Sequence, residues 1–504
     1  MHWADAFVRN LSGDQIFSTG ISPSGPIHVG NMREILTGDI LYKAAVDRGL
    51  MSRFMYLCDD LDPLRKVYPF LPDTYEEHVG KPLSRIPAPQ GEGTYSEYFL
   101  RPFLETLDVI NVSVEVVRTT DLYDRGVFAE AIDVVMRRKN DVARILEEIS
   151  GRAVGKDWYP YNPLCSNCGR ITKAKVEWYR FPEVGYRCQC GHEGVSDIRK
   201  AEGKMPWRVE WPAKWYALGV TVEPFGKDHG VKGGSYDTGK GIMEEIFGAK
   251  APEPLIYEHI FLKGKGAMHS STGVVIDAAD MVKFAPPQIL RFLVARSQPS
   301  RHIMFDPGAG LLNLIDEYEK YENLYASGGE LDEDARRAYE LSRLEQSTEK
   351  LSSIGFRHLV TLVQIYPREG DLLEALRRTG EGLDEITPVV RSNIDAIRRW
   401  LDRYAPDNVK FSLLEPHEKV VINDQERKLI AGFLESAGSI QWTPEAIHDM
   451  IHELIRNSGM QPKSGFAAFY RVLVGKERGP RLGYFLSTLG REFTMNRLSS
   501  AINM

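Results

Sequence analysis

The chain has 504 residues, which is long enough for about three domains. Its hydrophobic content of 43% and charged content of 26% are ordinary for a globular enzyme, and no apolar run is long enough to cross a bilayer. The net charge of -7 excludes a protein that is basic throughout, so nucleic-acid binding would need a local basic surface. The N-terminus lacks a basic segment followed by an apolar one, so we expect no secretory signal and a cytoplasmic location.

The first 60 residues predict a parallel βαβ unit. Residues 15–18 and 52–57 are short apolar runs, and residues 32–48 between them have a helical pattern. Ligands of such α/β sheets bind beyond the carboxyl ends of the strands. Three carboxylates follow the second run, where they either join an active site or are solvated and cap a helix: Asp59, Asp60 and Asp62.

The loop at residues 19–31 reads TGISPSGPIHVGN and leads from the first strand into the helix. A helix start presents backbone N–H groups and a positive dipole end to an anion, and Gly25 and Gly30 let the backbone approach a nucleotide closely. His28 adds a donor for a phosphate oxygen. The loop resembles the HIGH signature of class I aminoacyl-tRNA synthetases, with Asn31 in the last position. An ordinary turn between strand and helix is the alternative.

The pattern changes several times further along the chain. Residues 68–105 are rich in proline and glycine and predict irregular structure, whereas residues 122–149 are strongly helical. Residues 207–215 alternate in a way that predicts a strand, and residues 256–262 predict a buried strand. From about residue 284 onwards, helical patterns dominate.

Four of the five cysteines form two close pairs, and each pair is followed by a glycine: Cys165 and Cys168, Cys188 and Cys190. In a reducing cytoplasm this spacing favours a metal over disulfides. Four thiolates leave no open position on a tetrahedral ion, so we expect one structural zinc. His192 is an alternative to Cys190 as the fourth ligand, and four buried cysteines without metal are the alternative to the site as a whole.

A second glycine-rich loop follows the predicted strand at 256–262 and reads KGKGAMHSSTG at residues 263–273. It resembles the KMSKS or KMSSS signature of class I synthetases, in which a lysine neutralises charge that builds up on the leaving pyrophosphate. Ala267 stands where the first lysine of that signature is expected, and His269 replaces a serine. Either Lys263 or Lys265, or a protonated His269, would have to substitute; otherwise the loop is degraded and activation is slow.

Six further segments, in this order, resemble the class I lysyl-tRNA synthetases of the archaeal type. They are DDLDPLRKV at 59–67, WRVEWPAKW at 207–215, VEPFGKDH at 222–229, GGSYDTG at 233–239, YEH at 257–259 and FYRVLVGKERGPRLG at 469–483. Because these segments extend over nearly the whole chain, the resemblance concerns the entire protein and not one domain.

The resemblance implies a Rossmann-like α/β catalytic domain with a zinc-binding insertion, followed by an all-α C-terminal half that forms an α-helix cage. We expect the catalytic domain at residues 1–330, with its insertion at about 95–205 and a zinc knuckle at 160–195. A helical connecting domain is expected at 331–407 and a helical anticodon-binding domain at 408–504.

The implied reaction joins lysine and ATP into lysyl-adenylate and transfers the lysyl group to tRNA(Lys). Residues implied in catalysis are His28, Asn31, Lys263, Lys265, Met268, His269, Ser270 and Ser271. Residues implied in ATP binding are Pro23, His28, Gly30, Asn31, Gly226 and Asp228. Residues implied in lysine binding are Gly20, Ser22, Trp207, His229, Asp237 and Tyr257. Aromatic faces and acceptors suit an ammonium group, although Trp207 and Tyr257 are equally typical of an ordinary core.

Two further expectations concern metals. Magnesium should accompany ATP and be held mainly by phosphate oxygens. Many members of the family carry an additional metal site in the proline-rich segment, built from Asp, Cys and His. Residues 86–98 contain neither Cys nor His, so we expect one zinc and not two.

The C-terminal end is locally basic, and aromatic residues alternate with the basic ones there. The basic residues are Arg471, Lys476, Arg478, Arg481, Arg491 and Arg497, and the aromatic residues are Phe466, Phe469, Tyr470, Tyr484 and Phe485. Such a surface binds splayed anticodon bases by stacking and by phosphate contacts, but most of the aromatic residues are expected in the core of a helix bundle. The family resemblance assigns this half to anticodon recognition. We expect a monomer that binds no membrane.

Two rival functions remain open at this point. A class I synthetase of the glutamyl type would need a basic side chain for the substrate carboxylate, and none stands out in the pocket segments. A tRNA-binding paralogue that does not activate an amino acid is favoured only by Ala267 and His269.

Overall fold

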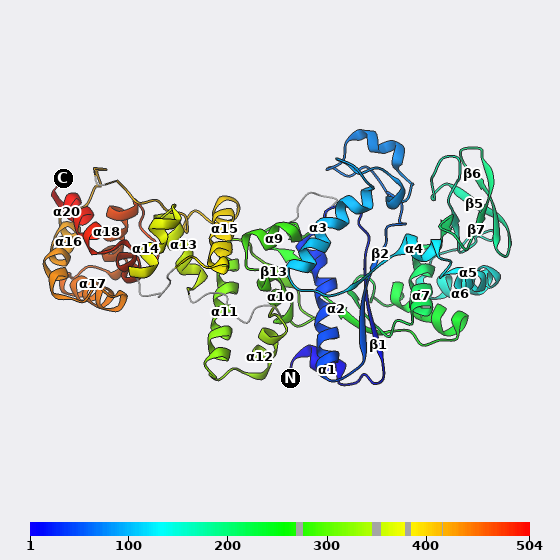
Figure 1. The fold of residues 1–504 in the computed structure, drawn as a ribbon, viewed down its shortest axis with the longest axis horizontal. Coiled ribbons are helices and arrows are strands. Elements are labelled where there is room, and N and C mark those ends of the chain that lie inside the picture. The colour runs from blue at the N-terminus through cyan, green and yellow to red at the C-terminus, as the bar shows by residue number, and fades with distance from the viewer. Residues whose placement is uncertain (269–275, 345–353, 379–384, 416, 504) are drawn as a thin grey trace. The chain divides into compact units, whose positions relative to one another are not determined.

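The computed structural model describes residues 1–268, 276–344, 354–378, 385–415 and 417–503 (Figure 1). The chain divides into two compact units. The first holds Met1–Val282, Pro287–Phe305 and Leu324–Gln346, and the second holds Lys283–Pro286, Asp306–Asn323 and Ser347–Met504. Across the described residues, no helix combines the length and the apolar character that spanning a lipid bilayer requires.

A parallel sheet forms the centre of the first unit, with the strand order β10-β9-β1-β2-β3 in the described part of the chain. Its strands are β1 (Gln15–Ile21), β2 (Ser52–Cys58), β3 (Glu115–Arg118), β9 (Val222–Gly226) and β10 (Glu253–Tyr257). The strand β2 pairs with one edge of β1, and β9 pairs with the other. The strand order therefore reverses at β1, and the carboxyl ends on either side of such a reversal are where α/β sheets bind ligands.

The predicted βαβ unit is confirmed, with α2 (Val29–Asp47) between β1 and β2. The side chains of Met32, Ile35, Leu36 and Ile40 are buried, which explains why this helix packs closely against the sheet. The other helices of the first unit are α1 (Trp3–Val8), α3 (Tyr95–Val109), α4 (Thr119–Asp124), α5 (Ala129–Arg137), α6 (Lys139–Ser150), α7 (Trp207–Leu218), α8 (Ser235–Ile242), α9 (Ala278–Phe284), α10 (Gln288–Ala295) and α12 (Glu333–Glu340). Short helical turns are η1 (Asp73–His78), η2 (Leu83–Arg85) and η3 (Met243–Phe247).

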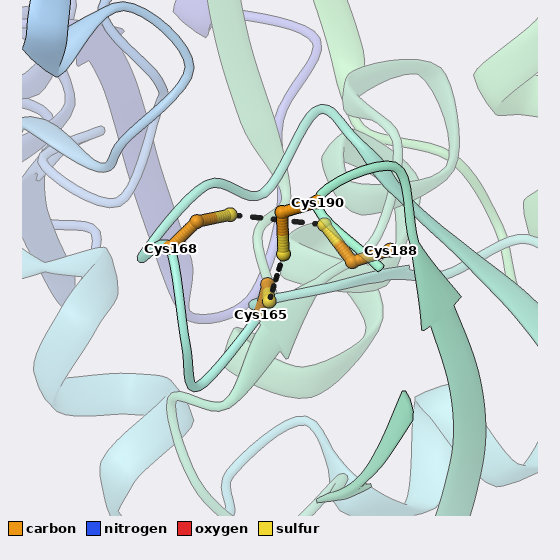
Figure 2. Close-up of side chains that lie close together, drawn as sticks. All are labelled: Cys165, Cys168, Cys188 and Cys190. Atoms are coloured by element: carbon orange, nitrogen blue, oxygen red, sulfur yellow. Dashed lines mark hydrogen bonds between the residues drawn. The ribbon is translucent and has the colours of Figure 1, made fainter. Parts of the chain in front are cut away.

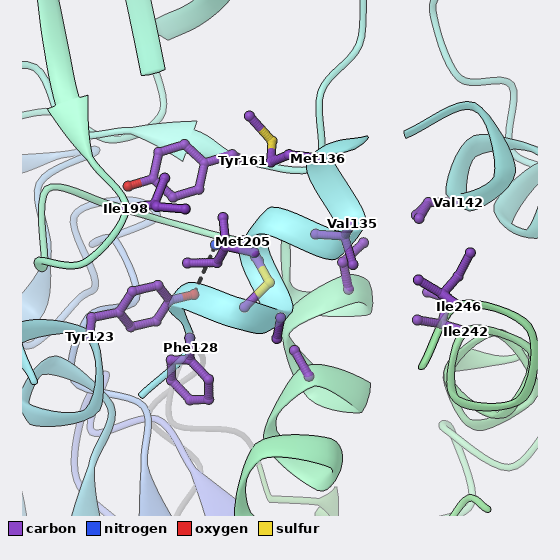
Figure 3. Packing of buried hydrophobic residues seen from close by; sticks show 14 of the residues in the cluster. Tyr123, Phe128, Val135, Met136, Val142, Tyr161, Ile198, Met205, Ile242 and Ile246 are labelled. Atoms are coloured by element: carbon purple, nitrogen blue, oxygen red, sulfur yellow. Dashed lines mark hydrogen bonds between the residues drawn. The ribbon is translucent and has the colours of Figure 1, made fainter. Parts of the chain in front are cut away.

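The segment between β3 and β9 has its own apolar core, in which side chains from α4 to α7 meet side chains of α8, which follows β9 (Figure 3). The hydroxyl of Tyr123 accepts a hydrogen bond of 2.9 Å from the backbone N–H of Met205, so this core also fixes the chain just before α7. The segment carries short antiparallel strands: β4 (Asn162–Pro163) with β8 (Gly203–Lys204), and β5 (Ala174–Arg180), β6 (Glu183–Cys188) and β7 (Glu193–Asp197) in sequence.

The structure corrects three predictions about local elements. Residues 207–215 are not a strand but the first part of α7, because tryptophans at every fourth position share one face of a helix. The predicted strand at 256–262 is two strands, β10 and β11 (Ile260–Leu262), which belong to different sheets. The predicted irregular segment ends at the helix α3, whose first turn is capped by the side chain of Thr94.

A small sheet carries the start of the second glycine-rich loop. The strand β11 pairs with β12 (Gly266–Ala267) on one side and with β13 (Ile303–Phe305) on the other. Gly264 in the turn between β11 and β12, and Gly266 at the start of β12, have positive φ, which a residue with a side chain would adopt only with strain.

The second unit is helical, as predicted for the C-terminal part. Its helices are α11 (Ala309–Ala326), α13 (Phe356–Ile365), α14 (Glu369–Arg378), α15 (Pro388–Arg403), α16 (Asp424–Ser436), α17 (Pro444–Ser458), α18 (Pro462–Val474), α19 (Leu482–Leu489) and α20 (Arg491–Asn503), with the short turn η5 (Ala437–Ser439) after α16. Helices α16 to α20 enclose a core that includes Phe433, Phe469 and Phe485.

Candidate active site

A cleft of about 460 Å³ opens at the carboxyl edge of the parallel sheet. Residues at the ends of β1, β9 and β10 line it, together with residues that follow β2 and the start of α2. The cleft therefore lies where the topology of the sheet predicts a ligand. It brings together predicted residues that are far apart in sequence: Gly20, Ser22, His28, Gly30, Asn31, Gly226, Asp228, His229, Tyr257 and Met268.

His28 and Asn31 together form the N-terminal cap of α2. The Nδ1 atom of His28 accepts a hydrogen bond of 3.3 Å from the Asn31 N–H, and Asn31 Oδ1 accepts one of 3.2 Å from the His28 N–H. Because Nδ1 is an acceptor, the neutral imidazole carries its proton on Nε2. A Cβ atom at Gly30 would lie 2.8 Å from the His28 ring, so only glycine leaves this ring in place.

The ends of the second glycine-rich loop are attached to the His28 loop. Before the loop, Met268 lines the same cleft as His28 and Asn31. After it, the N–H of Val29 donates to Ile276 O at 2.9 Å, and the N–H of Ala278 donates to Ile27 O at 3.0 Å. The described ends of the second loop therefore lie beside the His28 loop.

The predicted residues His269, Ser270 and Ser271 lie outside the described residues. Lys263 and Lys265 are exposed at the turn between β11 and β12, outside the lining of the cleft. Their proposed substitution for the lysine missing at Ala267 stays a prediction.

A partly buried carboxylate, which sequence reasoning missed, lines the cleft. Glu34 on α2 accepts a hydrogen bond of 3.1 Å from the N–H of Gly20 and one of 2.5 Å from the hydroxyl of Tyr257. Burial raises the pKa of Glu34 to about 7, against the lowering effect of these two donors. A carboxylate held in this way is an acceptor for a cation that enters the cleft.

Aromatic residues of α7 form a layer behind one wall of the cleft. The ring of His229 lies 5.1 Å from the ring of Trp207 and 5.6 Å from that of Trp211, measured between centroids. Burial lowers the pKa of His229, which favours a neutral imidazole in this layer. Glu223 on β9 fixes the layer from behind, because its carboxylate accepts hydrogen bonds from the indole N–H groups of Trp211 and Trp215.

Some predicted residues lie near the cleft without lining it. The ring of Trp207 contacts that of His229, which lines the cleft, but Trp207 is not among the lining residues. The carboxylate of Asp237 accepts a hydrogen bond of 2.8 Å from the N–H of Gly233 and so fixes the loop before α8. Pro23 is buried next to the lining residue Ser22.

Two polar side chains that line the cleft, one after β1 and one after β2, are hydrogen-bonded to each other. The hydroxyl of Ser22 donates a hydrogen bond of 2.7 Å to Asp62 Oδ2, and both residues line the cleft. Of the three carboxylates after β2, Asp62 is therefore the one that faces the cleft in this way. Asp60 instead accepts hydrogen bonds of 2.9 Å from the N–H and the hydroxyl of Thr120.

The four predicted cysteines meet at one point (Figure 2). Their sulfur atoms all lie within 4.8 Å of one another, and the Cys165–Cys190 and Cys168–Cys188 pairs are each 3.7 Å apart. A disulfide requires about 2.05 Å, whereas the edge of a zinc tetrahedron with bonds of about 2.3 Å is about 3.8 Å long. The thiol groups thus have the spacing of zinc ligands.

Local contacts distinguish Cys190 from His192 as the fourth member of this group. His192 Nε2 lies 2.8 Å from the hydroxyl oxygen of Ser166, whereas the sulfur of Cys190 points toward the other three. The N–H of His192 and the side chain of Asn167 lower the pKa of Cys190 to about 6, which favours the thiolate. The chemistry of this donor set fits a structural zinc.

The second unit has two neighbouring cavities at the start of α19. One of about 530 Å³ is lined by residues of α13 and α19, and one of about 490 Å³ by residues of α17 and α18. Pro444, Arg481 and Tyr484 line both cavities, and Tyr484 is 48% exposed.

Most of the predicted basic and aromatic residues of this end have structural roles. Phe469, Tyr470 and Phe485 are buried in the core, as expected for a helix bundle. The side chains of four basic residues bond within the unit: Arg471 with Glu426, Lys476 with the carbonyls of Asp407 and Lys410, Arg491 with Ala437 O and Arg497 with Val472 O. Arg478 and Arg481 are exposed.

The sequence matches two protein-family models. Residues 1–345 match the family described as tRNA synthetases class I (K), and residues 376–502 match the anticodon binding domain. A lysine–tRNA ligase from Picrophilus torridus is 56% identical over 503 residues, which cover 100% of this chain and 99% of the relative. Lysine–tRNA ligases from Thermoplasma volcanium and Thermoplasma acidophilum are 56% and 53% identical, with coverage of 100% of this chain and 99% of each relative.

Proposed function

The chain belongs to the class I tRNA synthetases (K), and we propose that the cleft of its first unit is the site where this lysine–tRNA ligase activates its amino acid. In the first step the carboxylate of lysine attacks the α-phosphorus of ATP, which forms lysyl-adenylate and releases pyrophosphate. In the second step a hydroxyl of the terminal ribose of tRNA(Lys) attacks the lysyl carbonyl, and AMP leaves. Because tRNA charging serves translation, we infer a cytoplasmic location.

The position of Glu34 is the observation that carries this assignment. Its carboxylate is partly buried, lines the cleft and is held by Gly20 and Tyr257. A lysine ammonium that enters beside it gains a charge-assisted hydrogen bond in a site with little water. A substrate carboxylate, as in the glutamyl type, would instead meet a group of the same charge. We therefore assign Glu34 to the ε-ammonium of lysine, with Tyr257 as the residue that orients it.

The start of α2 supports a role in phosphate binding. The N-terminal N–H groups and the dipole of the helix favour an anion there, and the proton on His28 Nε2 is a further donor. His28, Gly30 and Asn31 are thus proposed to bind ATP, together with Gly226 and Asp228 across the cleft. Magnesium, bound mainly by the phosphate oxygens, would supply further charge neutralisation.

The second glycine-rich loop is proposed to complete the phosphate site, with Met268 against the His28 loop. A lysine on the turn between β11 and β12 would take over from the residue missing at Ala267. Lys265→Ala should then lower pyrophosphate exchange sharply, with Lys263→Ala as the comparison. If both variants keep full activity, neither lysine substitutes.

The cysteine group is proposed to hold one structural zinc through Cys165, Cys168, Cys188 and Cys190. The spacing of their sulfur atoms supports this assignment, and four thiolates leave the ion without an open position. Its function would be to fix the fold of the segment between β4 and β8.

The two cavities of the second unit are proposed to receive unstacked bases of the anticodon. Tyr484 lies between them and offers an exposed aromatic face, and the exposed Arg481 offers a cation for a neighbouring phosphate. Lysine and ATP would bind in the first unit and the anticodon in the second, so tRNA(Lys) is a partner of both units.

Amino-acid-dependent exchange of pyrophosphate into ATP, measured for all twenty amino acids with and without tRNA, tests the proposal. Exchange with lysine alone is the expected result. Exchange with another amino acid, such as glutamate, would show that the enzyme is a class I synthetase of a different specificity. An absence of exchange with every amino acid, in a protein that still binds tRNA, would refute the catalytic role.

A further inference from the structure

The chain just after Asp62 forms part of the rim of the cleft and has no role in the activation step proposed above. This rim segment reads RKVYPF at residues 65–70. Arg65 and Tyr68 line the cleft, and Lys66 and Phe70 are exposed beside them. The rim segment thus presents two cations and two aromatic rings next to the site where the adenylate would form.

The two aromatic rings form a stack at the surface. The rings of Tyr68 and Phe70 are nearly parallel, with an angle of 8° between their planes and 5.5 Å between their centroids. Tyr68 is half-buried and Phe70 is 37% exposed, so both keep surface that a further flat ring can cover. Phe99 contacts Phe70 edge-on at 5.4 Å between centroids, which supports the stack from the protein side.

The two cations of the rim segment are available to an anion. Among the described residues, no carboxylate oxygen lies within 4.0 Å of the side-chain nitrogens of Arg65 or Lys66. The ammonium of Lys66 lies 5.6 Å from the centroid of the Tyr68 ring, a contact that leaves its N–H donors free for a second partner. An anion that approaches the stack therefore meets positive charge that no carboxylate neutralises.

The rim segment is fixed to the core of the first unit. The N–H of Leu64 donates to Lys81 O at 2.9 Å, and the N–H of Gly80 donates to Leu64 O at 2.8 Å. Leu64 belongs to a small buried core that also contains Tyr95. The hydroxyl of Tyr95 donates a hydrogen bond of 2.7 Å to Ser24 O, in the loop that leads to His28. The stack and the phosphate-binding loop are therefore held in one framework.

The chemistry of the rim segment fits an unpaired RNA strand. Such a strand offers a phosphate at every nucleotide and base faces that are free to stack on aromatic side chains. A duplex covers its base faces internally and would leave the stack of Tyr68 and Phe70 without a partner. The terminal ribose of tRNA has to enter the cleft to receive the lysyl group, so the unpaired nucleotides before it must cross the rim.

We propose that the rim segment binds the unpaired 3′ end of tRNA(Lys) at the entrance of the cleft. Tyr68 and Phe70 stack on a base close to the terminal adenosine, and Arg65 and Lys66 bind the neighbouring phosphates. The inference rests on the proposed function, because it takes tRNA as the acceptor of the lysyl group.

A cycle of protein and RNA truncations tests the stacking contact. The dissociation constants of the wild type and Phe70→Ala are measured by fluorescence anisotropy for tRNA(Lys) and for the same tRNA without its last three nucleotides. Phe70→Ala should weaken binding of the complete tRNA about five- to hundredfold, the range for one base on an aromatic ring, and leave binding of the shortened tRNA within about twofold. Tyr325→Ala is the matched control, because Tyr325 belongs to the same unit, is 36% exposed and does not line the cleft.

A fluorescent base gives a spectroscopic readout of the same contact. 2-Aminopurine is placed immediately before the terminal adenosine, where stacking on an aromatic ring quenches its fluorescence. The wild type and Tyr325→Ala should quench it on binding, whereas Phe70→Ala and Tyr68→Ala should not. If Tyr68→Ala does not fold, the exposed residue Phe70 carries this test alone.

The salt dependence of binding tests the phosphate contacts. Arg65→Gln should lower the slope of log affinity against log salt by about 0.7, the value for one phosphate of a single strand. The slope for the shortened tRNA should be the same in this variant and in the wild type. An unchanged slope for the complete tRNA would refute the role of Arg65.

The outcomes distinguish this inference from the proposed function. If the wild-type protein does not attach lysine to tRNA, the proposed function fails. If it does, and Phe70→Ala weakens the complete and the shortened tRNA equally or weakens neither, binding of the 3′ end by the rim segment is overturned. If Tyr68→Ala raises the Michaelis constant for ATP and leaves the 2-aminopurine quenched, Tyr68 serves the nucleotide site and not the RNA.

Discussion

Replacing Glu34 by glutamine tests the assignment of the lysine side chain most sharply. Glutamine has nearly the same shape, and its carbonyl oxygen can still accept a hydrogen bond from the Gly20 N–H or the Tyr257 hydroxyl. The substitution removes the negative charge and little else. Any loss of lysine activation then reports on the charge at this position.

The size of the effect follows from the hydrogen bonds of a partly buried carboxylate. A hydrogen bond to a charged group contributes about 1.5–3 kcal/mol. A net loss of about 3 kcal/mol corresponds to a fall of about a hundredfold in kcat/KM for lysine. Norleucine has no ε-ammonium, so its inhibition of lysine-dependent exchange should be the same in the variant and the wild type.

The pH dependence gives a second test of the same residue. Burial raises the pKa of Glu34 to about 7 from an ordinary value of 4.5, so the free protein binds a proton there between these values. That protonated form contributes stability below pH 4.5, which is lost as the pH rises through about 7. Lysine requires the carboxylate, so its affinity should rise about tenfold per pH unit up to about pH 7 and then level off.

The assay is lysine-dependent pyrophosphate exchange between pH 5.5 and 8.5, for the wild type and Glu34→Gln, with tRNA present. Burial lowers the pKa of His229, and this residue is present in both proteins, so its titration affects both alike. In the variant, the affinity for lysine should no longer rise as the pH increases toward 7. If Glu34→Gln keeps a wild-type kcat/KM for lysine, or the same pH profile, the role of Glu34 is wrong.

Three other substitutions test other parts of the protein. Gly30→Ala should lower exchange about a hundredfold in a folded protein, because the added Cβ displaces His28; unchanged kinetics would exclude a role for this ring. Cys168→Ser should reduce the zinc content measured by atomic absorption and lower the Tm, and an unaltered Tm with no zinc in the wild type would contradict a structural metal. Tyr484→Ala should raise the KM for tRNA about ten- to hundredfold and leave kcat at saturating tRNA unchanged; an unaffected KM would remove the stacking role.

Local patterns were sufficient to predict two of the sheet strands that frame the cleft. The apolar runs before the His28 loop and before Asp59 are β1 and β2, and the four cysteines meet as their spacing indicates. These features depend on residues that are close in sequence. Such features can be recognised from turn residues, helix caps and the spacing of nearby residues.

Other features arise only from long-range packing. The Glu34 carboxylate is held in the cleft by hydrogen bonds from Gly20, 14 residues away, and from Tyr257, 223 residues away. Asp62 and Lys204 are 142 residues apart, and nothing near either one predicts their contact. A carboxylate in a helix is usually solvated, so burial by distant segments is what identifies these groups.

The helix α7 was predicted as a strand for a different reason. Its tryptophans recur at every fourth position, which is the helical period, but polar and apolar residues between them also alternate and so favour a strand. The choice is decided by Glu223 on β9, which accepts hydrogen bonds from Trp211 and Trp215 and so needs both on one face. The spacing of the tryptophans was the signal that could have corrected the prediction.

The most direct test of the account is the identity of the amino acid that the protein attaches to tRNA. The full-length protein is incubated with ATP, magnesium, tRNA(Lys) and an equal mixture of all twenty amino acids, and the 3′-terminal adenosine is released and examined by mass spectrometry. We predict lysyl-adenosine as the product, and its loss when Glu34→Gln replaces the wild type. Another aminoacyl-adenosine, or none from a protein that still binds the tRNA, would contradict the account.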